Sequence, residues 1–183
     1  MTVLLLGGSP SFPSTTWRLQ QLVGERLAAL GHRTGALQVR ELPALALLRA
    51  DVKDPAIADA VARVRDADAI VIGTPVYKAS FSGVLKAFLD LLPQDGLRDK
   101  TVWSLATGGS LAHLLALDYA LLPVLSSLGA RSQIDPLFAT DSQLQFGTDG
   151  ECRIGEDVAR RLGVGARKVF ELLPHKVPVL ERC

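Results

Sequence analysis

The sequence predicts an α/β fold in which a parallel β-sheet carries helices on both faces. Short apolar runs alternate with amphipathic stretches along the 183 residues, and this alternation is typical of parallel strands joined by helices. The apolar runs lack a polar–apolar alternation, which suits strands covered on both faces. With 48% hydrophobic and 21% charged residues, the chain is expected to form one globular domain.

Five segments are expected to form strands. The clearest contains Ala69-Ile70-Val71-Ile72, and the weakest is the segment 33–39, which follows the first expected helix. The expected strands are 2–6, 33–39, 68–73, 101–106 and 132–138. Five strands suit a three-layer, flavodoxin-like sandwich with the order 2-1-3-4-5 better than a six-stranded dinucleotide-binding sheet.

Five further segments have apolar residues at helical spacing. They are 15–30, 55–65, 83–92, 111–128 and 155–173. The first follows helix-starting residues at Ser14 and Thr15 and stops at Gly31. The segment 41–54 shows no pattern that predicts a regular element. Residues 1–173 therefore form the predicted domain, and 174–183 form a C-terminal tail without an assigned role.

Charge and composition narrow the class of protein. The net charge is +1 and no basic run stands out, so neither nucleic acid nor an acidic membrane is an expected partner. The apolar start is too short for a signal peptide, and no apolar run is long enough to span a bilayer. We expect a soluble, cytoplasmic protein. Cys152 and Cys183 form neither a metal motif nor a CxxC pair and are expected to be free thiols.

In such sheets, ligands bind beyond the carboxyl ends of the strands. The loop 8–16 follows the first expected strand and offers five hydroxyls, on Ser9, Ser11, Ser14, Thr15 and Thr16. Together with the free amides of a helix start, they can bind a phosphate monoester without a basic side chain. An ordinary helix cap in a Ser/Pro loop is the alternative. The GxGxxG and GxxxxGK[ST] motifs are missing, which disfavours a Walker-type ATPase.

Two more loops leave expected strand ends. In the loop 74–83, Pro75 restricts the backbone, so that its amides can face the edge of a flat ring, and Tyr77 and Phe81 supply apolar faces. The alternative is that the loop only leads into a helix capped by Ser82, but this interpretation accounts for fewer of the residues in the loop. In the loop 107–110, paired glycines allow either close approach of a ligand or merely a tight turn. A lone histidine such as His113, just beyond, is more often structural or solvated than catalytic.

Together these loops resemble those of the NADPH-dependent FMN reductase family, and within it the branch that supplies reduced flavin to alkanesulfonate monooxygenases. The similarity rests on Gly8-Ser9-Pro10 with Ser14, on the segment 74–86 and on the segment 106–121, and it continues through 138–143. The second and third segments are specific, whereas the first alone would not be.

The resemblance implies roles for individual residues in binding FMN. The phosphate would be held by Ser9, Ser14, Thr15 and Thr16. The isoalloxazine and ribityl side would be lined by Pro75, Val76, Tyr77 and Lys78. The polar edge of the ring would be approached by Thr107, Gly108 and Gly109, with Ser110 beside them. The residues expected near the site, either from the same subunit or from a neighbouring one, are His113, Tyr119 and Asp141.

One departure concerns the phosphate. Many family members carry an arginine shortly after the Gly-Ser pair, where this chain has Ser11, and Arg18 is the nearest base in the sequence. A weaker grip on the phosphate would suit flavin as an exchangeable substrate.

The same branch carries a tyrosine insertion that forms a π-bulge at a subunit interface, and Tyr119 occupies the matching place. Pro123 cannot donate to the carbonyl of residue 119, which breaks the helical ladder there. A bulge is favoured over a buried tyrosine before a proline kink. Because the segment 111–128 is apolar nearly all round, a second subunit is expected to cover it, in a homodimer or a dimer of dimers.

The resemblance implies hydride transfer from NADPH to N5 of FMN, with no catalytic side chain, and a flavin-dependent monooxygenase as the consumer of reduced FMN. An FMN-bound quinone or azo-dye reductase is the first alternative. The second is a flavodoxin-like electron carrier, against which the pI of 7.8 counts. The sequence does not decide between NADPH and NADH, or between FMN and other flavins.

Overall fold

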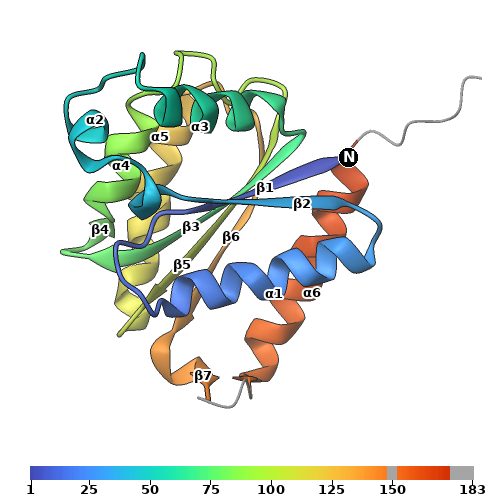
Figure 1. Ribbon diagram of the computed structural model, residues 1–183. Helices are drawn as coiled ribbons and strands as arrows, with labels where there is room; N and C mark the ends of the chain where they lie inside the picture. The colour runs from blue at the N-terminus through green and yellow to red at the C-terminus, as the bar shows by residue number, and fades with distance from the viewer. Residues whose placement is uncertain (148–151, 174–183) are drawn as a thin grey trace, which may run out of the picture.

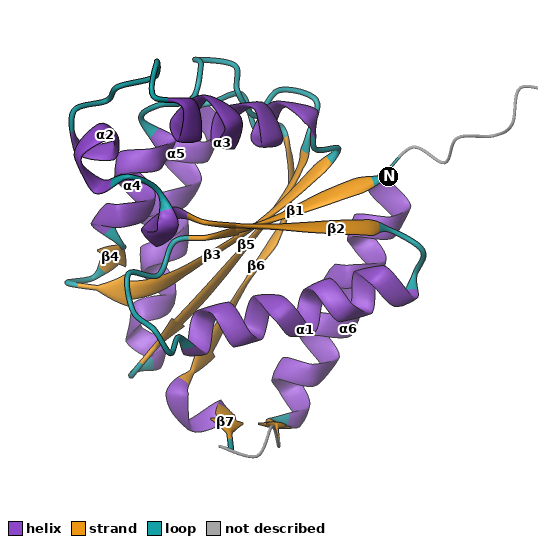
Figure 2. Ribbon diagram, viewed as in Figure 1, coloured by secondary structure: helices purple, strands orange, loops and turns teal. Residues whose placement is uncertain are grey.

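The computed structural model describes residues 1–147 and 152–173 and shows a three-layer α/β sandwich (Figure 1, Figure 2). Its central sheet contains five parallel strands in the order β2-β1-β3-β5-β6. These strands are β1 (Thr2–Gly7), β2 (Arg33–Gln38), β3 (Ala69–Tyr77), β5 (Thr101–Gly108) and β6 (Ser132–Thr140). Counted among the parallel strands alone, the order is 2-1-3-4-5, which confirms the predicted flavodoxin-like fold.

Helices cover both faces of the sheet (Figure 1). One face carries α1 (Thr15–Ala29) and α6 (Glu156–Leu172), whose apolar sides pack on a core that includes Leu5 and Trp103. The other face carries α3 (Pro55–Asp66), α4 (Gly83–Leu89) and α5 (Leu122–Ser127) over a second core. Burial on both faces explains why the central strands are apolar throughout.

Four expected helices correspond to α1, α3, α4 and α6, with small differences at their ends. The segment 41–54, which had no predicted structure, holds the helix α2 (Ala44–Leu48) after a short 3-10 turn, η1 (Val39–Glu41). Burial of Ala46 and Leu47 in the second core stabilises this short helix, which the local sequence alone does not predict.

The expectation of one continuous helix over 111–128 is wrong. The segment contains a 3-10 turn, η2 (Leu111–Leu114), a π-helical turn, η3 (Leu117–Leu121), and then α5. Pro123 removes an amide that would bond to the carbonyl of Tyr119, and the ladder widens at this place. The predicted bulge at Tyr119 is therefore confirmed, and the alternative of a buried tyrosine is excluded because its side chain is 79% exposed.

The sheet edge near the predicted loops contains elements that the sequence did not predict. β3 extends to Tyr77, and β4 (Ser80–Phe81) turns back antiparallel to it. A second, two-stranded sheet pairs β7 (Leu144–Phe146) with β8 (Cys152–Ile154) after a 3-10 turn, η4 (Asp141–Gln143). Cys152 is exposed and free, whereas Cys183 and the predicted tail lie outside the described residues. None of the described helices is long and apolar enough to cross a membrane.

Candidate functional site

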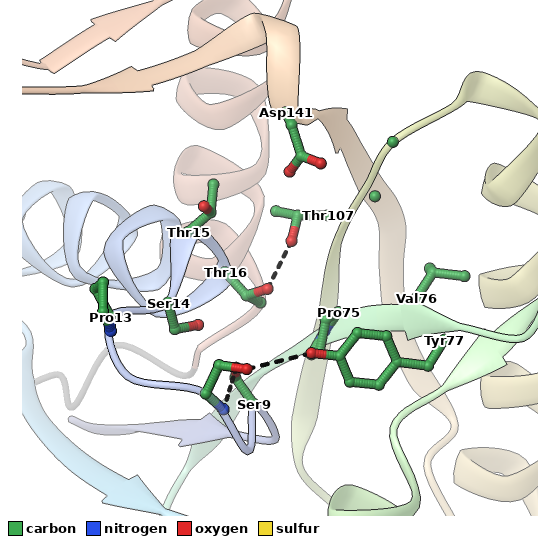
Figure 3. A pocket seen from close by; sticks show the side chains of 13 residues that line it. Ser9, Pro13, Ser14, Thr15, Thr16, Pro75, Val76, Tyr77, Thr107 and Asp141 are labelled. Carbon is green, nitrogen blue, oxygen red and sulfur yellow. Dashed lines mark hydrogen bonds between the residues drawn. The ribbon is translucent and has the colours of Figure 1, made fainter.

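A cavity of about 260 Å³ lies at the carboxyl ends of β1, β3 and β5 (Figure 3). The start of α1 and the loops after these strands form its walls. Its lining residues are Ser9, Ser11, Pro13, Ser14, Thr15, Thr16, Pro75, Val76, Tyr77, Thr107, Gly108, Gly109 and Asp141. The sheet order reverses beside β1, so the cavity occupies the usual ligand position of an open α/β sheet.

The start of α1 presents unused backbone donors to this cavity. Ser14 is the N-cap, and its Oγ accepts a hydrogen bond from the amide of Trp17 at 3.2 Å. The amide of Arg18 donates to the carbonyl of Ser14 at 3.1 Å. The amides of Thr15 and Thr16 belong to the first turn and have no acceptor within the helix. They lie at the positive end of the helix dipole, which favours an anion.

Two buried hydroxyls connect α1 to the sheet at the floor of the cavity. Thr16 Oγ1 and Thr107 Oγ1 are 2.6 Å apart, and Figure 3 shows both side chains pointing toward each other. One hydroxyl donates and the other accepts, and each retains lone pairs for a further partner. This bond fixes the first turn of α1 against the end of β5.

The first loop is held in place by the neighbouring strand and helix. The amide of Gly8 donates to the carbonyl of Gly73 at 2.7 Å, and the hydroxyl of Ser82 donates to the carbonyl of Gly8. The amide of Ser82 in turn donates to Thr74 Oγ1 at 2.9 Å. Ser82 caps α4, as the sequence suggested, and it also joins the first and second loops.

The end of β3 forms the opposite wall. Pro75, Val76 and Tyr77 line the cavity from this strand, and the Tyr77 side chain is 47% exposed. Its hydroxyl lies 3.4 Å from Ser11 Oγ, so the ring reaches across to the first loop. Figure 3 shows the Tyr77 ring beside Pro75 at the mouth of the cavity.

Four of the predicted binding residues do not line the cavity. Lys78 lies in the tight turn after β3, with a φ of 49°, and Ser110 caps η2 by accepting from the amide of Ala112 at 3.3 Å. His113 packs behind the third loop, because a Cβ added at Gly108 would lie 3.2 Å from its Nδ1. Tyr119 projects outward from η3.

Asp141, by contrast, lines the cavity from its own chain, at the end of β6. It is the one charged residue of the lining, and Figure 3 shows its carboxylate above Thr107.

The sequence reasoning missed Arg40. Its Nη1 donates to the carbonyl of Ser11 at 2.6 Å, and its guanidinium lies 5.2 Å from the centre of the Phe12 ring. Arg18, the base closest in sequence, instead lies over the Phe146 ring, at 5.4 Å from its centre. A positive charge therefore lies beside the loop in which Ser11 replaces an arginine. Only the path of β2 into η1 brings it there, so no local signal could have found it.

A second residue that the sequence reasoning missed is Gln20, which is fully buried inside α1. Its Nε2 donates to the carbonyls of Leu6 and Val71, both at 3.0 Å. These carbonyls belong to neighbouring strands, with Leu6 near the carboxyl end of β1 and Val71 in the first half of β3. Gln20 thus holds α1 in register with β1 and β3, directly behind the cavity.

Comparison with known proteins places this geometry in a family. The model of the NADPH-dependent FMN reductase family matches residues 1–145. An FMN reductase (NADPH) from Pseudomonas putida is 46% identical over 146 residues, which are 80% of this chain and 74% of the relative.

Solved structures agree with the sequence matches. An NADH:FMN oxidoreductase, solved in its apo form, superposes with a TM-score of 0.87 at 38% identity and covers 96% of this chain and 91% of its own. A flavodoxin from Streptococcus pneumoniae shares the fold alone, with a TM-score of 0.64 at 15% identity over 93% of this chain and 97% of its own. The family match over most of the domain, the 46% identity and the shared fold show that this chain belongs to the NADPH-dependent FMN reductase family.

Proposed function

We propose that the protein is an FMN reductase that transfers a hydride from NADPH to N5 of FMN. The observation that carries the proposal is the cavity at the strand ends, which combines an anion site at the start of α1 with a wall formed by the end of β3. The FMN reductase (NADPH) of Pseudomonas putida, at 46% identity, supports the same activity.

The phosphate of FMN would occupy the start of α1. The amides of Thr15 and Thr16 and the hydroxyls of Ser9 and Ser14 supply donors, and none of them carries a charge. Arg40 adds a positive charge from behind the first loop. Such a site suits a phosphate that must also leave, because much of the attraction comes from neutral donors.

The flat ring would lie between the end of β3 and the third loop. Pro75, Val76 and Tyr77 provide one side, and the bare backbone of Gly108 and Gly109 permits close approach on the other. When bound, FMN supplies the hydride-accepting chemistry. The protein would orient the ring, exclude water with Tyr77, and place backbone amides near the ring edge that becomes negative on reduction.

The direct test is oxidation of NADPH by the purified protein with and without added FMN. Thr107→Val should raise the KM for FMN by about fivefold, since one hydrogen bond contributes about 1 kcal/mol. Thr101→Val is the matched control, because Thr101 is a buried threonine at the opposite end of β5. FMN-independent oxidation, or equal effects of the two substitutions, would contradict the proposal.

The alternatives have different kinetic signatures. Ternary-complex kinetics with FMN as acceptor would support flavin as a substrate, whereas ping-pong kinetics with a quinone would support a quinone or azo-dye reductase. Anaerobic NADPH that fails to bleach the flavin would support an electron carrier. Parallel assays with NADH decide the choice of nicotinamide, since an NADPH reductase and an NADH oxidoreductase both occur among the related proteins.

We further propose that the protein works as a homodimer or tetramer and passes reduced FMN to a flavin-dependent monooxygenase. Four large apolar residues are exposed around the π turn: Leu111 at 67%, Leu114 at 36%, Leu115 at 55% and Tyr119 at 79%. A second copy that covered them would bury this patch. Tyr119→Ala should then change the oligomeric state or flavin retention, and a monomer at micromolar concentration in light scattering would contradict the assembly.

Release of reduced FMN can be tested without the partner. Anaerobic reduction of FMN in excess over enzyme, followed by rapid ultrafiltration, should leave reduced flavin in the filtrate. Reduced flavin that stays with the protein would contradict a supply role.

A further inference from the structure

The charges around the cavity at the strand ends are distributed unevenly. Among the described residues, its lining holds one charged side chain, and this is the carboxylate of Asp141, although the proposed ligand is itself an anion. Arg40 and Arg18 lie nearby but are not part of the lining, since Arg40 donates to the carbonyl of Ser11 and Arg18 lies over the Phe146 ring. The positive charges thus lie outside the cavity, and the charge that lines it is negative.

The end of β6 fixes the position of Asp141. β6 pairs in parallel with β5 so that Thr140 lies opposite Gly108, and Asp141 is the next residue in the chain. Thr140 is held by Gln143, whose Oε1 accepts hydrogen bonds from the amide of Thr140 at 2.9 Å and from its hydroxyl at 3.2 Å. Figure 3 shows the Asp141 carboxylate above Thr107. The carboxylate therefore lies beside the third loop.

The carboxylate of Asp141 has no partner that would neutralise it. The residue is exposed, and its carboxylate makes no hydrogen bond or ion pair within residues 1–147 and 152–173. An exposed carboxylate carries its negative charge at neutral pH. Aspartate in the first turn of a short helix such as η4 is favourable in itself, because it interacts with the helix dipole. That role does not explain why the side chain lines the cavity.

The proposed reaction changes the charge of the ligand. NADPH gives up two electrons and one proton as a hydride and becomes NADP⁺, and FMN gains one negative charge. The phosphate is the same in both forms of FMN, so the start of α1 attracts them equally. The added charge develops at the ring edge, which would lie against Gly108 and Gly109, beside the carboxylate of Asp141. Repulsion from this carboxylate therefore acts more strongly on reduced FMN than on oxidised FMN.

We propose that Asp141 selects against the reduced form of the flavin and so promotes its release from the site. This inference rests on the proposed FMN reductase function. The backbone amides of the third loop favour the negative ring, and the carboxylate offsets part of that attraction. Such a difference suits a reductase that supplies flavin to another enzyme, because the product shares most contacts of the substrate. By thermodynamic linkage, weaker binding of reduced FMN also lowers the midpoint potential of the bound flavin.

The test compares the unsubstituted protein with Asp141→Asn, which removes the charge and keeps the size of the side chain. The dissociation constant of oxidised FMN is measured by quenching of flavin fluorescence, and that of reduced FMN by anaerobic ultrafiltration, both without nicotinamide. The ratio of the reduced to the oxidised constant should fall by about fivefold in Asp141→Asn, the size expected for one pair of charges in water. This fold-change corresponds to an upward shift of about 20 mV in the midpoint potential of bound FMN.

Two variants and a salt series serve as controls. Asp59→Asn makes the same change in net charge on α3, where Asp59 is exposed and outside the cavity lining, and should leave the ratio unchanged. Asp141→Glu keeps the charge and should keep the ratio close to that of the unsubstituted protein. Raising the salt concentration from about 0.01 M to about 1 M should reduce the difference between Asp141→Asn and the unsubstituted protein, because salt screens exposed charges.

Three results would overturn the proposal. The first is an equal change of both constants in Asp141→Asn, which would mean that the carboxylate contacts a part common to both forms, such as the ribityl hydroxyls. The second is the same ratio in Asp141→Asn and Asp59→Asn. The third is a fall of the ratio in Asp141→Glu as large as in Asp141→Asn, which would assign the effect to the shape of the loop. These results leave the FMN reductase function intact, whereas failure of the unsubstituted protein to bind oxidised FMN would contradict both proposals.

Discussion

Two glycines of α6 should respond in opposite ways to the same substitution. A Cβ at Gly165 would lie 2.0 Å from the Trp103 ring, about 1.5 Å short of an ordinary carbon–carbon contact. At Gly163, the corresponding Cβ would meet only Arg26 Nη1, at 3.9 Å. Alanine gains about 1 kcal/mol over glycine inside a helix. Gly163→Ala should therefore stabilise the protein by up to about 1 kcal/mol.

For Gly165→Ala, the overlap with the indole reverses this gain. Overpacking a core costs about 1–3 kcal/mol, and here the upper end applies because Trp103 is fully buried between β5 and α6. The net loss should be about 2 kcal/mol after the helix gain of about 1 kcal/mol is subtracted. At about 2–4 °C per kcal/mol, Tm should fall by roughly 4–8 °C, while Gly163→Ala raises it by roughly 2–4 °C.

The assay is thermal and urea unfolding of both variants at one protein concentration, because subunit association also contributes to stability. The urea midpoint should move while the slope stays constant. If Gly165→Ala were as stable as the unsubstituted protein, the close contact between α6 and Trp103 would be wrong. If Gly163→Ala lost as much stability as Gly165→Ala, helix propensity would be the wrong basis for the comparison.

Three further predictions concern the site and its surroundings. Arg40→Met should raise the KM for FMN by about fivefold but leave the KM for riboflavin, which has no phosphate, unchanged; equal changes for both would show that Arg40 acts only through the shape of the loop at Ser11. Ala79→Gly should stabilise the protein by about 0.5 kcal/mol in urea unfolding, because Ala79 has a φ of 59°, a conformation that is strained for alanine but not for glycine. The strain that glycine removes exceeds the conformational entropy that it adds to the unfolded chain. A loss of stability would contradict this reasoning. The hydrogen bond from Arg160 lowers the pKa of Asp157, so the stabilising contribution of this carboxylate is present above about pH 4 and is lost as the pH falls through the lowered pKa. The Asp157→Asn variant should therefore show a smaller drop in Tm between pH 6 and pH 3 than the unsubstituted protein. An equal drop in both proteins would show that Asp157 does not contribute to the pH dependence of stability.

Most of the candidate site was predictable because its residues lie in loops next to strand ends. Ser9, Ser14 and Thr16 follow β1, and Thr107 and Gly108 end β5. Parallel strands bring their carboxyl ends to one edge, so the prediction of five strands already implied that these loops meet. The fold class followed from the same strand pattern, whereas the family followed from the resemblance of the loop segments to those of known FMN reductases.

Residues at the margin of the site were harder to place. His113 and Ser110 follow the glycine pair closely in the sequence, yet the 3-10 turn η2 carries them out of the lining. Arg40 is far from the first loop in sequence and touches it only because η1 follows β2. Such contacts depend on the direction in which a short turn leaves the sheet, and hydrophobic periodicity contains no information about that direction.

The sequence by itself determined the layers of the fold, since runs such as Ala69-Ile70-Val71-Ile72 must be buried on both faces wherever they lie. It also determined the break at Pro123, because a missing amide is a property of the residue. Only the tertiary structure decided where Trp103 lies against α6 and how β6 bulges beside it. Those features arise from the packing of segments far apart in the chain, and packing depends on the shapes of both partners at once.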